Sequence, residues 1–514
     1  MRIHYLVFLL VISYESFQLN TTTGKSSTYE NSTEALLDQT PEGGIFKECY
    51  DELGCLEADQ SWFHNQYRPV NLKPSKREIV KTQFVFIRKN LCSDEVTFDL
   101  DFKVVTTTKE SLKSAKFKNG VFLFILIHDF TSNGYTGWIK HISNVLKLRT
   151  KKCNIISVDW GAGAQPPFDQ AVANARLVAL EIVHFLKFLR KHNDIVMDEV
   201  HLIGHGLGAH IAGYVGKDHQ ARKITVFTGL DPTGPRFSGM PIHVKLDATD
   251  AKYVEILHTD AMDYNSQGTR ELEGHADFFI NNANIQPGCG EAQSKYDLLS
   301  ITRGMLKEGE IMPGCSHKRA FKYYIESLEV EDCTFLGIKC QSYSDFKQGK
   351  CTSCGKKGRD CRTFGLVTYP TENRGSYFLQ TDESRPFCLF QYRITIVLQK
   401  SKSSYYGFFE FIMIDKYHTV TKSAMAEARQ FQDGVNSFVF YAKAPEMMKI
   451  KEVKIGWKEK TIRFCLFRCY WWVNVKKVSL RSLNSNKKNW KEMDFCPKSG
   501  FSIRSGEYIE FVAC

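Results

Sequence analysis

The segment with the clearest chemical implication joins a short strand to a helix rich in small residues. It runs from Val200 to His210 and reads VHLIGHGLGAH. A strand, a tight turn and a small-residue helix are the setting of a nucleophile elbow, Gly-x-Ser-x-Gly. The elbow holds its central residue in a strained, positive-φ conformation, and flanking glycines let strand and helix approach closely. Here the central residue is Gly206, which supplies no nucleophile.

The elements around this turn alternate between strands and helices. Residues 121–127 form a continuous apolar run, which is typical of a strand covered on both faces, and residues 154–158 resemble it. Residues 168–191 carry apolar side chains at helical spacing. Strands that alternate with long helices predict an α/β fold with a doubly wound, mainly parallel sheet.

The pattern changes after a turn-rich junction near residue 370. Residues 392–398 and 453–457 place apolar side chains at alternate positions. Such alternation indicates strands with one buried face. We therefore expect a second domain folded as an antiparallel β-sandwich.

The N-terminus indicates secretion. A basic residue precedes an apolar run over residues 5–12 that is too short to span a bilayer, as in a signal peptide. Asn20 and Asn31 begin N-glycosylation acceptor sequences in a polar extension. The predicted organisation is a signal peptide (1–18), a flexible glycosylated extension (19–45), an α/β domain (46–370) and a β-sandwich (371–514).

Composition fits a secreted globular protein. The chain has 514 residues, 43% hydrophobic residues and a net charge of +11, values that exclude a disordered or collagen-like chain. No basic motif or recognition element accompanies the charge, so nucleic acid is not an expected partner. Many lysines lie in the second domain, where they form either a solvated face or a patch for glycosaminoglycan or anionic lipid: Lys449, Lys451, Lys454, Lys458, Lys460, Lys476, Lys477, Lys487, Lys488 and Lys491.

An ordered set of motifs resembles the pancreatic lipase family, in which a secreted α/β-hydrolase domain precedes a C2-like PLAT domain. The resemblance covers residues 47–514. Besides the elbow, it rests on Cys49-Tyr-Asp-Glu-Leu-Gly-Cys55, Val158-Asp-Trp160, Gly229-Leu-Asp-Pro232, Leu257-His-Thr-Asp260 and Cys315-Ser-His-Lys-Arg-Ala-Phe-Lys-Tyr-Tyr324.

The resemblance implies a catalytic triad in the order Ser, Asp, His. Asp231 matches the acid, which would hold the imidazole tautomer, and His317 matches the base, which would transfer a proton. Gly206 stands at the nucleophile position. Two members without the third do not form an acyl-enzyme.

The oxyanion hole also departs from the family pattern. Phe130 and Leu207 match the residues whose backbone N–H groups would face the oxyanion. Asp129 replaces the glycine of the family's His-Gly-Phe segment. Its carboxylate either opposes a developing oxyanion or points to solvent.

The resemblance further implies a lid and a calcium site. Cys289 and Cys315 match the pair that closes the lid, and residues 297–306 between them form an amphipathic segment, either a lid over a lipid-facing cavity or a surface helix. Asp247 and Asp250 match the family's structural calcium ligands. Backbone carbonyls of Ile242 and Lys245 would complete the site, and two exposed loop acids are the alternative.

Cys351-x-x-Cys354 is not read as a zinc motif, because the chain is expected to be secreted and no histidine lies nearby. The resemblance implies five disulfides. The implied pairs are Cys49–Cys55, Cys289–Cys315, Cys340–Cys351, Cys354–Cys361 and Cys496–Cys514. The states of Cys92, Cys153, Cys333, Cys388, Cys465 and Cys469 stay open.

Three functions compete. The first is a secreted pseudo-lipase that binds lipid or a lipid–water interface, with a glycosaminoglycan or colipase-like protein as further partners. The second is a weak ester hydrolase in which His317 activates water directly. The third is the activity that family membership implies, hydrolysis of triacylglycerol or phospholipid. The missing nucleophile at Gly206 favours the first.

Overall fold

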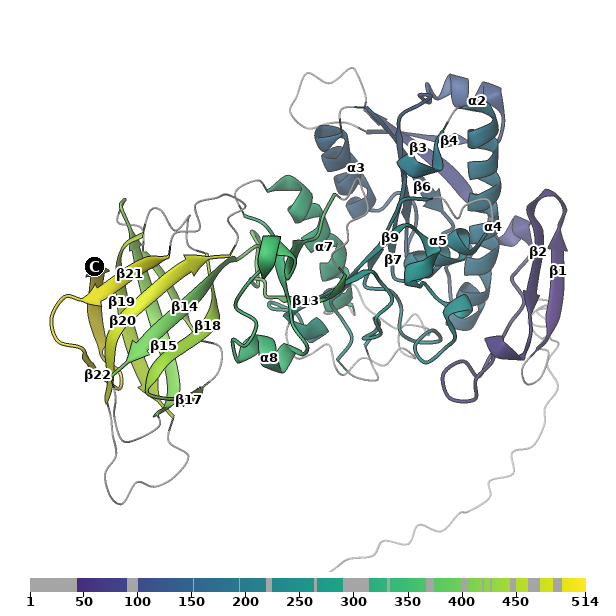
Figure 1. Ribbon diagram of the computed structural model, residues 1–514. Helices are drawn as coiled ribbons and strands as arrows, with labels where there is room; N and C mark the ends of the chain where they lie inside the picture. Colours follow the sequence, from purple (N-terminus) through teal and green to yellow (C-terminus); the bar gives the residue numbers. More distant parts are fainter. Residues whose placement is uncertain are drawn as a thin grey trace, which may run out of the picture. The chain divides into compact units, whose positions relative to one another are not determined.

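The computed structural model (Figure 1) describes two bodies of secondary structure. The described residues are 44–89, 100–150, 152–193, 195–218, 224–262, 266–289, 314–330, 333–366, 374–399, 405–417, 420–425, 428–443, 450–460, 472–483 and 492–514. The predicted signal peptide, Asn20, Asn31 and the predicted lid segment 297–306 lie outside these residues.

The first body is built on a large mixed sheet with strand order β12-β11-β13-β10-β9-β8-β7-β5-β6-β3-β4. Neighbours from β6 through β5 to β13 pair in parallel, whereas β3, β4, β11 and β12 pair antiparallel at the two edges. The strands are β3 (Gln83–Lys89), β4 (Leu100–Val105), β5 (Phe122–Ile127), β6 (Cys153–Asp159), β7 (Val200–His205), β8 (Val226–Leu230), β9 (Tyr253–His258), β10 (Ala276–Ile280), β11 (Leu336–Lys339), β12 (Cys361–Thr363) and β13 (Gly375–Leu379).

Helices cover both faces of this sheet, which explains its continuous apolar strands. In β5, Leu123 and Ile125 join a core that contains α4 and α5 residues, whereas Phe124 and Leu126 join a second core with α3 and α7 residues. The helices are α1 (Arg77–Val80), α2 (Lys109–Ser114), α3 (Gly137–Arg149), α4 (Phe168–His192), α5 (Leu207–Lys217), α7 (Cys315–Glu329) and α8 (Tyr343–Lys347).

Short elements complete the first body. A hairpin of β1 (Phe46–Tyr50) and β2 (Gly54–Ala58) precedes the sheet. The 3-10 turns are η2 (Asp51–Leu53), η3 (Gln60–Trp62), η4 (Met197–Glu199), η5 (Ile242–Val244), η6 (Ala248–Asp250), η7 (Asn281–Ala283) and η9 (Lys356–Gly358). Among the described residues, no helix is long and apolar enough to cross a membrane.

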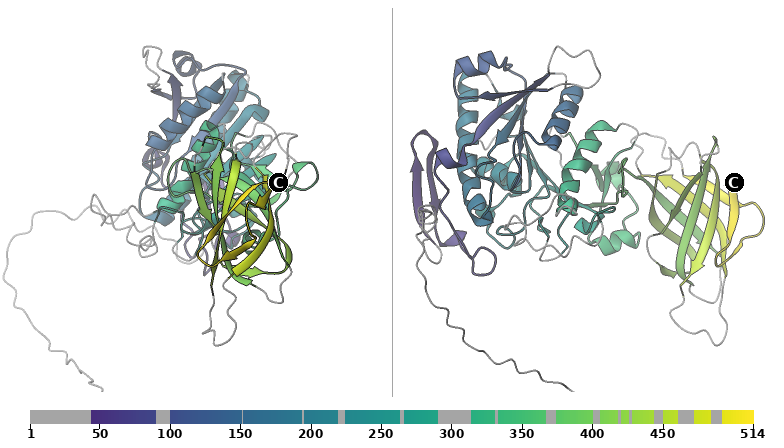
Figure 2. Two further views of the ribbon diagram at one scale, coloured as in Figure 1. Left: turned by 90° about the vertical axis from the view of Figure 1, so that its left-hand side faces the viewer. Right: turned by 180° about the vertical axis from the view of Figure 1, so that it is seen from behind.

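The second body is an antiparallel sheet, drawn in green to yellow in Figure 2. Its buried residues alternate along the strands; in β15, for example, every second residue is buried. The strands are β14 (Phe390–Leu398), β15 (Tyr405–Asp415), β16 (Val420–Ala424), β17 (Arg429–Phe431), β18 (Gly434–Ala442), β19 (Ile450–Glu459), β20 (Trp472–Ser482), β21 (Met493–Pro497), β22 (Ser502–Arg504) and β23 (Tyr508–Ala513). The predicted fold class, an α/β-hydrolase sheet followed by an antiparallel β-sandwich, is confirmed.

The junction lies later than the predicted boundary at 370/371. β13 (Gly375–Leu379) pairs in parallel with β10 and belongs to the first sheet, and the second sheet begins at β14 (Phe390–Leu398). The turn residues near 370 therefore precede the last strand of the first sheet rather than separating two domains.

Disulfides reinforce loops and sheet edges. Among the described residues, the structure contains the five pairs implied by the resemblance and a sixth, Cys333–Cys388, which the sequence left open. Cys153 is a buried free thiol, and Cys92, Cys465 and Cys469 lie outside the described residues.

Candidate active site

The elbow lies between β7 and α5. Gly206 adopts φ 55° and ψ −117°, and the helix begins at Leu207. A Cβ atom at Gly204 would lie 2.2 Å from the carbonyl oxygen of Gly208, and one at Gly208 would lie 2.3 Å from the carbonyl oxygen of Ile127. The glycines are therefore required by the close approach of strand and helix.

Asp231 and His317 lie together although 86 residues separate them. Asp231 follows β8, and His317 lies in the first turn of α7. Nδ1 of His317 donates a hydrogen bond of 2.6 Å to Oδ2 of Asp231. Oδ1 of Asp231 accepts backbone N–H groups of Thr259 and Asp260, at 2.7 and 3.1 Å. The acid–base pair of a triad is thus assembled and buried.

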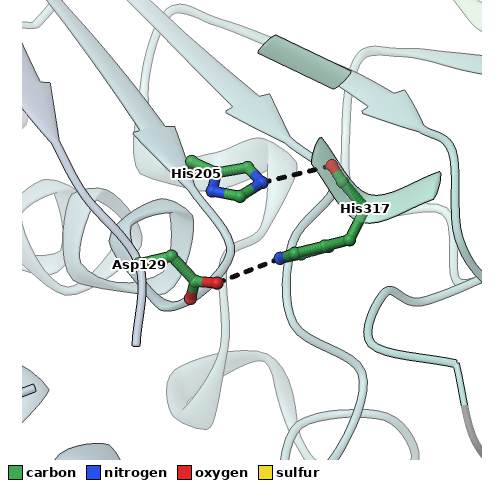
Figure 3. Close-up of side chains that lie close together, drawn as sticks. All are labelled: Asp129, His205 and His317. Atoms are coloured by element: carbon green, nitrogen blue, oxygen red, sulfur yellow. Dashed lines mark hydrogen bonds and ion pairs between the residues drawn. The ribbon is translucent and has the colours of Figure 1, made fainter. Parts of the chain in front are cut away.

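Asp129 places its carboxylate where a nucleophile would be. Oδ1 accepts the backbone N–H of Leu207 at 2.7 Å, and Oδ2 accepts Nε2 of His317 at 3.0 Å (Figure 3). A Cβ atom on Gly206 would lie 2.1 Å from Oδ1 of Asp129, 2.2 Å from Cγ and 2.5 Å from Oδ2. The carboxylate therefore fills the space of a side chain at position 206 and uses the N–H group that an oxyanion would need.

The two carboxylates also determine the charge of His317. Burial favours the neutral imidazole, but the hydrogen bonds and charges of Asp129 and Asp231 outweigh burial and raise the pKa of His317 to about 10. Burial likewise favours a neutral Asp129, but the hydrogen bond and charge of His317 lower the pKa of Asp129 to about 2. At neutral pH the pair is an imidazolium and a carboxylate, so His317 has no lone pair with which to act as a base.

His205 is the third polar side chain of this cluster. Burial lowers its pKa to about 4, so it is neutral at pH 7. Its Nε2 lies 3.2 Å from the carbonyl oxygen of His317, which can only accept, so Nε2 carries the proton (Figure 3). The two imidazole rings lie 4.3 Å apart and are tilted by 38°. Asp129, His205 and His317 could each offer a metal ligand, and hydrogen bonds link Asp129 to His317 and His205 to His317.

Phe130 is the other residue expected at the oxyanion hole. It follows Asp129 directly, and its ring packs edge to face against Phe168, with the centroids 5.2 Å apart. Leu207 is fully buried, and its N–H is already bonded to Asp129. Of these two residues, Leu207 therefore supplies the backbone contact to the carboxylate, whereas Phe130 contributes an apolar wall.

The loop expected to bind calcium is contacted by a lysine. Nζ of Lys217 donates to the carbonyl oxygen of Lys245 at 2.7 Å and to both oxygens of Asp250 at 2.7 and 2.6 Å. Asp247 instead caps η6 by accepting the N–H of Thr249. The ammonium makes the contacts that a calcium ion would make with two predicted ligands, so calcium would have to displace it. Sequence reasoning missed this role of Lys217, because Lys217 lies 28 residues before Lys245 and no motif links the two.

The remaining predicted residues occupy the edges of the site. Ile242 begins η5, and its carbonyl oxygen accepts the N–H of Lys245 at 3.4 Å. Cys315, two residues before His317, is bonded to Cys289, so this disulfide anchors the start of α7 beside the imidazole. The predicted lid between these cysteines lies outside the described residues.

A strand–elbow–helix unit with an Asp–His pair defines this chain as an α/β-hydrolase-type protein. The sequence profile of the family "Lipase" matches residues 47–387, and the chain belongs to that family. It is similar to pancreatic triacylglycerol lipase of Equus caballus, at 27% identity over 91% of this chain and 97% of the relative. Two proteins of Mus musculus are also similar: pancreatic triacylglycerol lipase, at 32% identity (69% of this chain, 75% of the relative), and inactive pancreatic lipase-related protein 1, at 31% (68% and 72%).

Proposed function

We propose that this chain is a secreted lipase-family protein that binds lipid or a lipid–water interface without hydrolysing esters. The observation that carries the proposal is the position of the Asp129 carboxylate, between Leu207 N–H and His317 Nε2. Acyl transfer needs a nucleophile, a free base and an open oxyanion hole. In this site Gly206 supplies no nucleophile, His317 is protonated, and the Leu207 N–H is occupied.

Retention of the fold supports a role other than catalysis. The elbow glycines, the Asp231–His317 pair and the disulfide at α7 are all present although the nucleophile is absent. A relative at 31% identity is itself named an inactive pancreatic lipase-related protein. The proposal therefore has a precedent in a relative that carries the word inactive in its name.

Exposed apolar side chains on the chain segment that follows Thr259 and Asp260 support lipid as the ligand. Thr259 and Asp260 hold Asp231 through their N–H groups, and Met262 follows them with 54% of its surface exposed. Leu272, on the chain segment that leads from this loop to β10, is 65% exposed. Large apolar side chains that remain in water beside a site suit contact with an apolar surface.

Three of the predicted lysines of the second sheet are paired with carboxylates, which favours a solvated face over a glycosaminoglycan patch at these positions. Lys454 pairs with Glu510 at 2.8 Å, Lys458 with Glu410 at 2.8 Å, and Lys477 with Asp494 at 2.6 Å. Each pair balances its own charge, so the sheet gains little net positive potential from these residues. Lipid is thus the partner proposed first, and secretion is supported by six disulfides among the described residues.

Flotation of the full-length protein with triacylglycerol droplets coated with phosphatidylcholine tests this proposal. We expect the protein to float with the droplets, and we expect Met262→Asp together with Leu272→Asp to reduce the floating fraction. The matched control is Val196→Asp, a similarly exposed position that precedes η4 at the amino end of β7, whereas the elbow follows the carboxyl end of that strand. Failure of the wild-type protein to float, or equal loss in the control, would contradict lipid binding through these two side chains.

A further inference from the structure

We propose that Asp129 is a nucleophile toward strained alkyl carbon, and that this site opens an apolar epoxide to a vicinal diol through an alkyl ester of Asp129. This activity goes beyond interface binding and does not depend on it. The juxtaposition that carries it is a carboxylate in the nucleophile's position, with an acid–base pair on one oxygen and a backbone N–H on the other.

The two carboxylate oxygens have different surroundings. Oδ1 is fixed by the Leu207 N–H at 2.7 Å, in the place of an oxyanion. Oδ2 lies 3.0 Å from Nε2 of His317 and keeps a second lone pair. The Asp129 side chain is 16% exposed, whereas those of His317 and Asp231 are 3% and 0% exposed. Among these three side chains, Asp129 is therefore the one that an incoming molecule can reach.

A carboxylate suits alkyl transfer better than acyl transfer. On an ester carbonyl, the tetrahedral adduct expels the carboxylate again, because an alkoxide is the much poorer leaving group. On an epoxide, release of ring strain drives the opening, and the product is a stable ester. The features that exclude lipase chemistry therefore leave this chemistry available.

The cycle balances with water as its only co-reactant. Oδ2 of Asp129 attacks an epoxide carbon, the ring C–O bond breaks, and the alkoxide takes the Nε2 proton of His317. Neutral His317 then removes a proton from water, and the hydroxide attacks Cγ of Asp129. The oxyanion forms on Oδ1 at the Leu207 N–H, which is the contact already present in the structure.

Collapse of this adduct restores the site. The Cγ–Oδ2 bond breaks, and the diol alkoxide takes the proton from His317. The new carboxylic acid of Asp129 returns its proton to His317, so the imidazolium and carboxylate are regenerated. Asp231 holds Nδ1 throughout and stabilises the positive ring. The diol therefore carries the former Oδ2 atom, and Asp129 keeps an oxygen from water.

The surroundings select an apolar substrate. The ring of Phe130, next to the nucleophile, packs against Phe168. Trp138 and Phe321 stack on each other, 5.4 Å apart, and both contact the ring of His205. Among the described residues, the charged partner of Asp129 is His317, and Asp231 contacts the same imidazolium, so little positive charge is left for an anionic group.

Single-turnover labelling tests the proposal, with styrene oxide as the probe. The full-length protein, in excess, is incubated with the epoxide in water enriched in heavy oxygen. We expect heavy oxygen in the peptide that contains Asp129 and not in the first diol formed. We expect an acid quench within one turnover of the wild-type protein to trap an ester on Asp129, with a mass increase equal to one epoxide molecule. His317→Gln should form this ester more slowly, because it lacks the proton donor for ring opening.

Asp129→Asn should lower diol formation at least a hundredfold, whereas Asp198→Asn, at an exposed position, should not change it. Circular dichroism and thermal melting establish that each variant is folded. If His317→Gln does not fold, the presence or absence of heavy oxygen in the wild-type Asp129 peptide tests the proposal without that variant. Absence of both label and adduct, or equal diol formation by Asp129→Asn, would overturn the proposal.

Discussion

Replacing Gly206 with serine is expected to leave the protein unable to hydrolyse esters, and activity is expected only when Asp129 is also replaced by glycine. The added Cβ would lie 2.1–2.5 Å from the atoms of the Asp129 carboxyl group, far inside van der Waals contact. Serine must therefore displace a carboxylate that holds the Leu207 N–H and His317. Without that displacement, the hydroxyl cannot reach the imidazole.

The magnitude follows from the same contacts. A residue with a Cβ atom at φ 55° is strained by about 1–3 kcal/mol. Overpacking against Asp129 adds about 1–3 kcal/mol, and each lost charged hydrogen bond is worth about 1.5–3 kcal/mol. We expect Gly206→Ser to lower the free energy of unfolding by at least about 3 kcal/mol. The Asp129→Gly, Gly206→Ser double variant should regain the share of the free energy of unfolding that the single variant loses to overpacking.

The assay is fatty acid release from emulsified tributyrin, combined with urea unfolding of each variant. The double variant should exceed the single variant at least about a hundredfold, because blocking one oxyanion donor alone costs about 10²–10³. Gly206→Ala is the control for stability, since it adds the same Cβ without a hydroxyl. Equal hydrolysis by the single and double variants would refute the claim that Asp129 obstructs the site.

Three further predictions follow from individual contacts. The pKa of His317 is raised from 6.5 to about 10, so the protonated imidazole stabilises the fold fully below pH 6.5, and this contribution is lost as the pH rises through 10. The pKa of Asp129 is lowered from 3.8 to about 2, so the carboxylate stabilises the fold above pH 3.8, and this contribution is lost as the pH falls through 2. The difference in melting temperature between wild type and Asp129→Asn should therefore be largest between pH 4 and 6.5, and a constant difference from pH 2 to 10 would contradict the ion pair. Lys217→Ala removes the ammonium partner of the buried Asp250 carboxylate and should lower the free energy of unfolding by about 3 kcal/mol, a loss that added calcium should restore. The melting temperature of the wild-type protein should not respond to a chelator, and a response would show that calcium displaces the lysine. Gly208→Ala places a Cβ 2.3 Å from the backbone of β5 and should destabilise the fold by about 3 kcal/mol in urea unfolding, with Gly137→Ala, where nothing lies within 4 Å, as the control.

Much of the first sheet could be predicted because its signals are local. Residues 121–127 are apolar without interruption, and the structure buries both faces of β5. The elbow glycines predict a close approach of strand and helix, and the structure shows this approach at Gly204 and Gly208. The junction was placed too early because turn residues occur within a domain as readily as between domains, and only the pairing of β13 with β10 decides which.

The arrangement at the site could be predicted only in part. Motif order identified Asp231 and His317, but the direction of the Asp129 side chain depends on three elements that meet in space, the ends of β5, β7 and the start of α7. Glycine at position 206 is what makes room for that carboxylate. Lys217 was missed for a similar reason, because its partner Asp250 is 33 residues away and the contact has no sequence signature.

Fatty acid release by the wild-type protein, measured on emulsified triacylglycerol, tests the central claim most directly. The claim is that the site cannot perform acyl transfer while Asp129 occupies it and His317 is protonated. We predict release no faster than in buffer, with wild type and His317→Gln indistinguishable. Release above buffer that His317→Gln abolishes would contradict the account, because it would show that the imidazole still acts as a base on esters.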